Sequence, residues 1–292
     1  MFLQIPLEMI NYFINTCACF AMPKKFMNTI NYWLEIPEDQ IKKDWERYEV
    51  STAGFLMTQD IVEGKKLRRG KPTVHEVYGI PSAMNALYYS LTCSFTATEF
   101  TGKETMCRFL VRYGLNTDLH IELADRSICP TEELYYQICR DRGLLMFFLN
   151  HVLITQEICG NELDLINLVN KVGTYLTIVD ECRRVAVNNT EDIQAVHFSY
   201  PIMYTINNDK DKGQLLLRLM QERPTEKSVL EYALSIVKSS GTLEHAKKQL
   251  YLLKREILEE YYKLPKNPFM EGFISDYIDP SVEFEEITWE LS

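Results

Sequence analysis

Apolar residues recur at three- and four-residue spacing along most of this chain, and this helical period constrains its fold more than any other feature. The spacing predicts helices over residues 83–97, 133–158, 162–182, 213–221, 227–239 and 242–262. Alternating strand patterns bounded by Asn-Gly or Asp-Gly turns are almost absent. With 46% hydrophobic residues and only 12 glycines and 11 prolines among 292 residues, the chain can bury a large core. We therefore expect an all-α fold.

The chain divides into a long helical part and a short acidic tail. From about residue 264 the sequence becomes acidic and is interrupted by prolines. We interpret this tail as an extension that packs on the body of the protein or is partly disordered. The sequence contains no internal repeat and no low-complexity stretch. We expect residues 1–263 to form a single helical domain and residues 264–292 to form a C-terminal extension.

Charge and cysteine usage narrow the range of partners. A formal net charge of −10 makes nucleic acid and anionic membranes unfavourable partners for the molecule as a whole. The 8 cysteines are scattered without CxxC spacing, which favours reduced thiols and a cytoplasmic location over a disulfide framework or a zinc site. The N-terminus is apolar but Glu8 interrupts it, so we expect a first buried helix. No apolar run is long enough for a transmembrane helix.

Residues 59–70, QDIVEGKKLRRG, combine acidic and basic side chains in an order suited to diphosphate chemistry. Gln59 and Glu63 are four residues apart and would share one face of a helix. A carboxylate pair there would hold a hard cation such as Mg²⁺ against phosphate oxygens, but Gln59 replaces one carboxylate by a neutral amide. Arg68 and Arg69 follow as planar groups that bind phosphate in a bidentate manner.

A second acidic pair, Asp180-Glu181, lies near the end of an apolar helical stretch, in YLTIVDECRR (175–184). Two acidic helix sites that face one cavity are what an enzyme acting on a metal–diphosphate complex needs. Simple ion pairs are the alternative interpretation. Asp180 and Arg184 stand at the i,i+4 spacing of a helical ion pair, and Glu63 can pair with one of the two lysines that follow it.

Three sequence motifs resemble those of the trans-isoprenyl diphosphate synthase family, and of animal-type geranylgeranyl diphosphate synthases in particular. They are LRRGKPTVHEVYGIPSAMN (67–85), CPTEELY (129–135) and HFSYP (197–201), and the resemblance runs from about residue 19 to residue 262. It implies an isoprenoid-synthase-type bundle of antiparallel helices around a central cavity. It also implies Mg²⁺ as cofactor, an allylic prenyl diphosphate as substrate and a homodimer.

The resemblance carries site roles onto numbered positions of this sequence. It implies that the metal ligands are Gln59, Asp60, Glu63, Asp180 and Glu181. It implies that the allylic diphosphate is bound by Arg69, Arg142 and His197, and that Arg68 is the remaining arginine of the second pocket, which binds isopentenyl diphosphate. Arg69 is retained from the family pattern, Arg142 replaces a lysine and keeps a cation, and His197 replaces a lysine and keeps a hydrogen-bond donor. We expect these three side chains to stabilise the leaving diphosphate.

The departures from the family pattern concentrate in the pocket for the condensing partner, isopentenyl diphosphate. The resemblance places a lysine, an arginine and a histidine of that pocket at Phe20, Pro23 and Thr52. None of these three carries a charge, and each charge-assisted contact to a diphosphate is worth about 1.5–3 kcal/mol. Acceptor binding should therefore weaken by several orders of magnitude, unless Lys24 or Lys25 substitutes from one turn away.

An enzyme that ionises an allylic diphosphate without a condensing partner leaves a carbocation that loses a proton, cyclises or takes up water. This is the reaction of class I terpene synthases, and the chain resembles the insect terpene synthases that are similar to this family. We expect a Mg²⁺-dependent lyase that converts geranyl or farnesyl diphosphate into a volatile mono- or sesquiterpene. Phe55 lies one helical turn before Gln59. In the family an aromatic ring there blocks longer substrates, so it favours ten- and fifteen-carbon chains.

Two other functions stay open at the level of the sequence. An altered acceptor pocket built from Lys24, Lys25 and Arg68 would make the protein a prenyltransferase that elongates prenyl diphosphates. A paralogue that has lost catalysis, with Gln59 as the sign of that loss, would instead bind a synthase subunit and regulate it. Added isopentenyl diphosphate separates a prenyltransferase from a lyase, because only the condensing enzyme consumes it.

Overall fold

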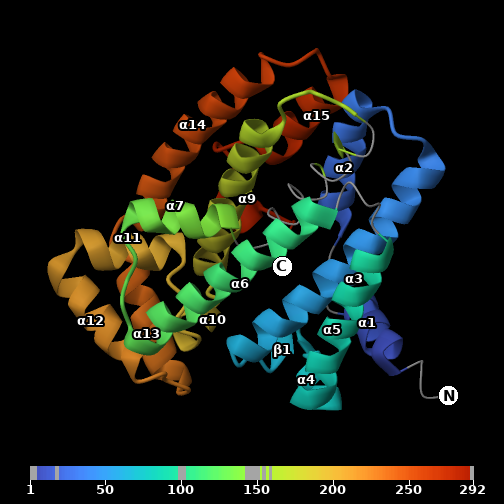
Figure 1. The fold of residues 1–292 in the computed structure, drawn as a ribbon. Helices are drawn as coiled ribbons and strands as arrows, with labels where there is room; N and C mark the ends of the chain where they lie inside the picture. Colours follow the sequence, from blue (N-terminus) through green and yellow to red (C-terminus); the bar gives the residue numbers. More distant parts are fainter. Residues whose placement is uncertain are drawn as a thin grey trace. The chain divides into compact units, whose positions relative to one another are not determined.

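The structure is a computed structural model that describes residues 5–16, 20–97, 103–141, 152, 156, 157 and 160–289. Helices make up most of this described part, and its strand structure consists of one two-stranded hairpin (Figure 1). The predicted all-α fold is confirmed. Within the described residues, no helix combines the length and the apolarity needed to cross a bilayer.

The described residues form two compact units. The first contains the described residues up to Val111 together with those from 152 to 163. The second contains residues 112–141 and 164–289, so α6 (Lys103–Arg126) begins in the first unit and ends in the second. The single domain expected over residues 1–263 stays a prediction.

Helices α3 and α5 approach each other closely within the first unit. The elements of this unit are α1 (Ile5–Thr16), α2 (Ala21–Leu34), α3 (Glu38–Val62), β1 (Leu67–Arg68), β2 (Lys71–Pro72), α4 (Val74–Tyr78) and α5 (Ile80–Ala97). A Cβ atom added to Gly54 of α3 would lie 2.1 Å from the Oγ atom of Ser90 on α5. Glycine therefore leaves room for the Ser90 hydroxyl, and α5 packs against α3, whose C-terminal end carries the first acidic motif.

A tight hairpin connects α3 to α4. Arg68 pairs with Lys71 in an antiparallel register, and the two loop residues, Arg69 and Gly70, have φ angles of 52° and 73°. Positive φ at both loop residues is typical of the type I′ turn that suits the twist of a two-residue hairpin. The sequence pattern does not indicate this hairpin, because a two-residue strand is too short to show alternation.

The second unit is built around α9, most of whose residues are buried. Its further elements are α7 (Glu132–Asp141), α9 (Ile166–Ala186), α10 (Glu191–Gln194), α11 (Tyr200–Asn208), α12 (Lys210–Gln221), α13 (Lys227–Lys238), α14 (Thr242–Tyr261), α15 (Pro268–Tyr277) and the 3₁₀ turn η1 (Phe284–Glu286). Helix α9 continues four residues beyond the predicted end at residue 182. Two arginines occupy its last turn, where basic side chains interact favourably with the helix dipole.

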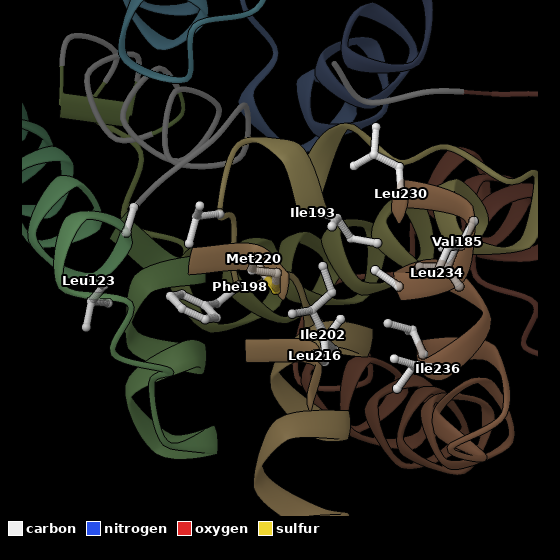
Figure 2. Packing of buried hydrophobic residues seen from close by; sticks show 14 of the residues in the cluster. Leu123, Val185, Ile193, Phe198, Ile202, Leu216, Met220, Leu230, Leu234 and Ile236 are labelled. Carbon is white, nitrogen blue, oxygen red and sulfur yellow. The ribbon is translucent and has the colours of Figure 1, made fainter. Parts of the chain in front are cut away.

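Apolar side chains from α6, α7, α9, α10, α11, α12 and α13 form the hydrophobic core of this unit. Figure 2 shows Val185, Ile193, Phe198 and Ile202 pointing into one cluster with residues of α12 and α13. These four side chains are at most 5% exposed. Their packing in the core therefore positions the backbone of the residues next to them in sequence. The polar residues that adjoin them in sequence are therefore held in place as well.

Candidate active site

The first acidic motif lies at the C-terminal end of α3. The Nε2 atom of Gln59 donates a hydrogen bond of 2.8 Å to Oε1 of Glu63, as expected of side chains that share one helix face. The Nζ atom of Lys65 lies 2.8 Å from the other carboxylate oxygen of Glu63. The structure thus brings Gln59 and Glu63 together, and it also realises the ion pair of Glu63 with a following lysine.

Asp60 forms a buried ion pair with Arg68. The Nε atom of Arg68 lies 3.0 Å from both oxygens of the Asp60 carboxylate, and its Nη2 atom lies 2.7 Å from Oδ1. Asp60 is fully buried and Arg68 is 5% exposed, with the guanidinium 5.9 Å from the centroid of the Phe13 ring. Planar bidentate pairing of this kind is strong and geometrically specific, so each partner engages the other before any substrate arrives.

The described side chains of the first motif do not fit a Mg²⁺ ion as they stand. A hard cation requires anionic oxygens that are free to coordinate it. Here Arg68 neutralises Asp60, and Lys65 neutralises Glu63 while Gln59 turns its amide nitrogen toward it. The charges of the motif are balanced within the protein.

Two further residues expected in the site, Arg69 and Phe55, lie in the same unit as the first acidic motif. Arg69 is half-buried at the first loop position of the hairpin. Phe55 is buried, and its ring meets the ring of Phe109 edge-on with centroids 5.5 Å apart. Arg142 lies outside the described residues.

Phe20, Pro23 and Thr52 stand where the family resemblance places the cations of the isopentenyl diphosphate pocket. The ring of Phe20 meets Trp45 edge-on at 6.1 Å and Tyr48 at 6.0 Å between centroids. Pro23 is buried in the first turn of α2, and Thr52 is fully buried on α3. Burial raises the pKa of Tyr48 well above its usual value, so this side chain stays neutral. None of the three side chains at positions 20, 23 and 52 provides a charge that binds a diphosphate.

The second acidic motif contains a carboxylate pair that shares one guanidinium. The Nη1 atom of Arg184 donates to Oδ2 of Asp180 at 2.6 Å. Its Nη2 and Nε atoms donate to Oδ2 of Asp192, at 3.2 and 3.3 Å. The ion pair of Asp180 with Arg184, which the sequence offered as an alternative to metal binding, is confirmed. Asp192 joins it from α10.

Glu181 points to different partners from those of Asp180. Its Oε2 atom accepts two hydrogen bonds of 2.6 Å, one from the Tyr135 hydroxyl and one from the backbone N–H of Tyr200. Tyr200 is the first residue of α11, so the carboxyl group caps a helix N-terminus. Burial nevertheless raises the pKa of Glu181 to about 7, outweighing the lowering effect of Arg184.

His197 lies between the two acidic groups of this cluster. Its Nδ1 atom is 3.5 Å from Oδ1 of Asp192, and its Nε2 atom is 3.9 Å from Oε1 of Glu181. The ring of His120 meets it edge-on, with centroids 5.1 Å apart. No sequence pattern links His120 to His197, because the two histidines are distant in the chain and only the fold brings them together.

The hydrophobic core positions this polar cluster. Arg184, Asp192 and His197 each precede a core residue, namely Val185, Ile193 and Phe198 (Figure 2). Sequence reasoning missed Asp192 and Tyr135 as members of the site. Tyr135 lies in the motif CPTEELY, which carried the family resemblance, so that motif was the available signal for it.

The fit of the second motif to a metal ion is also poor in this arrangement. Among the residues that the structure describes, no group of three or more histidine, cysteine, aspartate or glutamate side chains is placed to hold a metal ion. Asp180 is engaged by Arg184, and Glu181 is engaged by two donors. The carboxylates are present, but the hydrogen bonds and ion pairs described for them are made to protein groups.

Fold and motifs together define the class of this protein. The polyprenyl synthetase family matches residues 24–237, which is most of the chain. The chain belongs to the polyprenyl synthetase family, an enzyme family of isoprenoid biosynthesis that acts on allylic prenyl diphosphates. The family resemblance inferred from the sequence is confirmed, and the all-helical structure is consistent with an isoprenoid synthase fold.

Individual relatives cover nearly the whole chain. A geranylgeranyl pyrophosphate synthase of Dictyostelium discoideum is 28% identical over 282 residues, which is 91% of this chain and 92% of the relative. A geranylgeranyl pyrophosphate synthase of Mucor circinelloides f. lusitanicus is 28% identical and covers 86% of both chains. A terpene synthase of Matsumurasca onukii is 27% identical and covers 87% of both. The chain is thus similar both to prenyltransferases and to an insect terpene synthase.

Proposed function

We propose that this protein ionises an allylic prenyl diphosphate, geranyl or farnesyl diphosphate, without condensing it with isopentenyl diphosphate. The observation that carries the proposal is the packing of Phe20 against Trp45 and Tyr48. The family resemblance assigns a diphosphate-binding lysine to position 20, and an aromatic ring in an aromatic cluster cannot take over that role. The burial of Pro23 and Thr52 supports the same conclusion.

The proposed reaction begins with cleavage of the bond between the allylic carbon and the diphosphate oxygen, which takes the electron pair. The allylic cation then loses a proton to the released diphosphate, directly or after cyclisation, which gives a neutral terpene and protonated inorganic diphosphate. Cationic side chains stabilise the charge on the leaving group, and Arg69 at the hairpin turn is the described residue that we assign to this role. Mg²⁺ dependence stays a prediction, because the described carboxylates are engaged by protein groups.

Prenyl transfer is the second candidate, and the relatives favour it. Two of the three relatives described above carry the name geranylgeranyl pyrophosphate synthase. Lys24 and Lys25 follow Phe20 by one turn. Lys24 places its Nζ atom 5.8 Å from the centroid of the Trp45 ring, so a cation lies close to the altered pocket. If these lysines bind isopentenyl diphosphate, the protein condenses it with the allylic diphosphate and does not merely ionise the allylic substrate.

The test is incubation of the purified protein with geranyl and, separately, farnesyl diphosphate, with and without Mg²⁺ and isopentenyl diphosphate. Volatile products are measured by gas chromatography–mass spectrometry, and elongated diphosphates by liquid chromatography. We expect a volatile terpene whose yield is unaffected by isopentenyl diphosphate. We also expect Arg69→Gln to lower kcat/KM by about 10²–10³, the effect of removing one donor to developing charge.

The matched control is Arg126→Gln, which removes an exposed arginine paired with Glu122 on α6 and should leave the rate unchanged. Longer prenyl diphosphates would establish prenyl transfer and overturn the lyase proposal. Absence of turnover on both substrates, together with binding to a synthase subunit, would instead identify a regulatory paralogue.

A further inference from the structure

The guanidinium of Arg184 is the positive charge that balances the carboxylates of Asp180 and Asp192 at the second acidic motif. Its guanidinium lies between Asp180 and Asp192 and donates to an oxygen of each. The arginine side chain is 18% exposed, and the two carboxylate side chains are 7% and 9% exposed. The three groups therefore form a nearly buried acid–base–acid cluster, and the arginine is permanently charged.

A guanidinium and a divalent metal ion compete for the same partners. Both are stabilised by anionic oxygens that converge on one point. Two aspartates from different elements, α9 and α10, converge here on Arg184. A cation that replaced the guanidinium would meet two negative charges in a largely desolvated site, where electrostatic attraction is stronger than in water.

Of the hydrogen bonds described for the Arg184 guanidinium, none is made to Glu181. Adjacent residues of a helix do not face each other, and Glu181 directs Oε2 to Tyr135 and to the N-terminus of α11. Its two hydrogen bonds of 2.6 Å connect α9 with α7 and α11. Glu181 therefore holds neighbouring helices together, whereas Asp192 is the carboxylate that shares a cation with Asp180.

We propose that Arg184 is the resident cation of the Asp180–Asp192 pair, and that a divalent metal ion binds this pair only by displacing the guanidinium. Asp192, rather than Glu181, is then the second carboxylate of the cation site. The inference concerns the site of the proposed function, but it is tested by metal binding without turnover. Its failure is thus distinguishable from failure of the proposed reaction.

The test is titration of the full-length protein with Mn²⁺, in which electron paramagnetic resonance measures the concentration of free Mn²⁺. The titration is then repeated with Mg²⁺ as a competitor. We expect Arg184→Gln to bind Mn²⁺ at least about tenfold more tightly than the wild type, since affinity follows the charge offered by the site. Arg184→Lys keeps a cation and should stay close to the wild type. The exposed Arg126→Gln serves as the matched arginine control. Asp192→Asn in the Arg184→Gln background should abolish the gain.

An equal affinity of the wild type and Arg184→Gln would overturn the proposal, as would tight wild-type binding that is lost in Asp180→Asn. If Arg184→Gln does not fold without metal, its thermal midpoint in increasing Mg²⁺ decides the question. Mg²⁺ should then neutralise the repulsion between Asp180 and Asp192. The thermal midpoint of Arg184→Gln should therefore rise more steeply with Mg²⁺ concentration than that of Arg184→Lys. A midpoint independent of Mg²⁺ would overturn the proposal equally well.

Discussion

Glu181 accepts two short hydrogen bonds, and yet burial raises the pKa of its carboxyl group to about 7. The unfolded chain exposes this group to water, where its pKa is near 4.5. The native state therefore holds a proton that the unfolded state releases as the pH rises from about 4.5 to about 7. By linkage, this residue's contribution to stability is complete below pH 4.5 and is lost as the pH rises through 7.

The substitution Glu181→Gln should remove this loss of stability. Its amide oxygen can accept the hydrogen bonds from Tyr135 and Tyr200, and the side chain carries no charge at any pH. In buffer that contains a chelator, we expect the variant to match the wild type at pH 4.5. At pH 8 we expect it to exceed the wild type by on the order of 2–3 kcal/mol in free energy of unfolding. Urea unfolding at the two pH values measures the difference.

Glu231→Gln is the control for this experiment, because Glu231 is an exposed glutamate on α13. It should change the free energy of unfolding by less than about 0.5 kcal/mol at either pH. An equal offset between Glu181→Gln and wild type at pH 4.5 and pH 8 would contradict a raised pKa at this position.

At the scale of elements, α11 and α12 cross at a glycine. A Cβ atom added to Gly213 of α12 would lie 2.5 Å from the backbone oxygen of Ile206 and 2.7 Å from its Cα atom. No side-chain rotation relieves a clash with backbone, so the two helices would have to move apart. Because α11 begins at Tyr200, the partner of Glu181, this crossing also bears on the second acidic motif.

Gly213→Ala should therefore lower the free energy of unfolding by about 1–3 kcal/mol, the usual cost of overpacking, despite the better helix propensity of alanine. Gly114→Ala on α6 is the matched control, since no described atom beyond the neighbouring backbone of its own helix lies within 4 Å of the added Cβ. This control should raise stability by about 0.5–1 kcal/mol through helix propensity. Urea denaturation of both variants gives the comparison, and a stabilised Gly213→Ala would contradict the close crossing.

At the scale of the whole molecule, local patterns predicted the helices well and the site less well. Helices α13 and α14 end within one residue of the stretches predicted from apolar spacing. The pairing of Gln59 with Glu63 followed from the same rule, because i,i+4 neighbours meet on any helix. The ion pair of Asp60 with Arg68 did not follow from this rule, because the contact depends on the path of the β1–β2 hairpin. That hairpin leaves no pattern in the sequence.

The second acidic cluster depends on contacts between distant parts of the chain. Tyr135 and Glu181 are 46 residues apart, and Asp192 reaches Arg184 only because α9 is followed by a turn and a short helix. Such contacts are set by tertiary packing, which periodicity within one element does not encode. The family resemblance supplied Asp180 and Glu181 as a pair, but the structure assigns them different partners.

The C-terminal segment packs on α9 in the second unit. Phe284 is 3% exposed and Ile278 is fully buried, and Arg183, on α9, donates from Nε to the backbone oxygen of Ile287 at 2.8 Å. Lys247, on α14, pairs with Glu283 at 2.5 Å and lies 5.6 Å from the Phe284 ring centroid. The segment thus contributes apolar burial beside the helix that carries the second acidic motif.

Phe284→Ala should consequently destabilise the unit as a whole and not merely loosen the tail. Truncation of a buried phenylalanine costs about 3–5 kcal/mol, and we expect a loss of about 3 kcal/mol in free energy of unfolding, measured by urea unfolding monitored by circular dichroism. Phe269→Ala is the matched control, because Phe269 on α15 is 60% exposed and its loss should cost less than about 0.5 kcal/mol. If Phe284→Ala unfolds like the wild type while a protease removes only its last residues, the segment is an appendage. A cooperative loss of stability would instead make it part of the scaffold that holds α9, and with it Asp180 and Glu181.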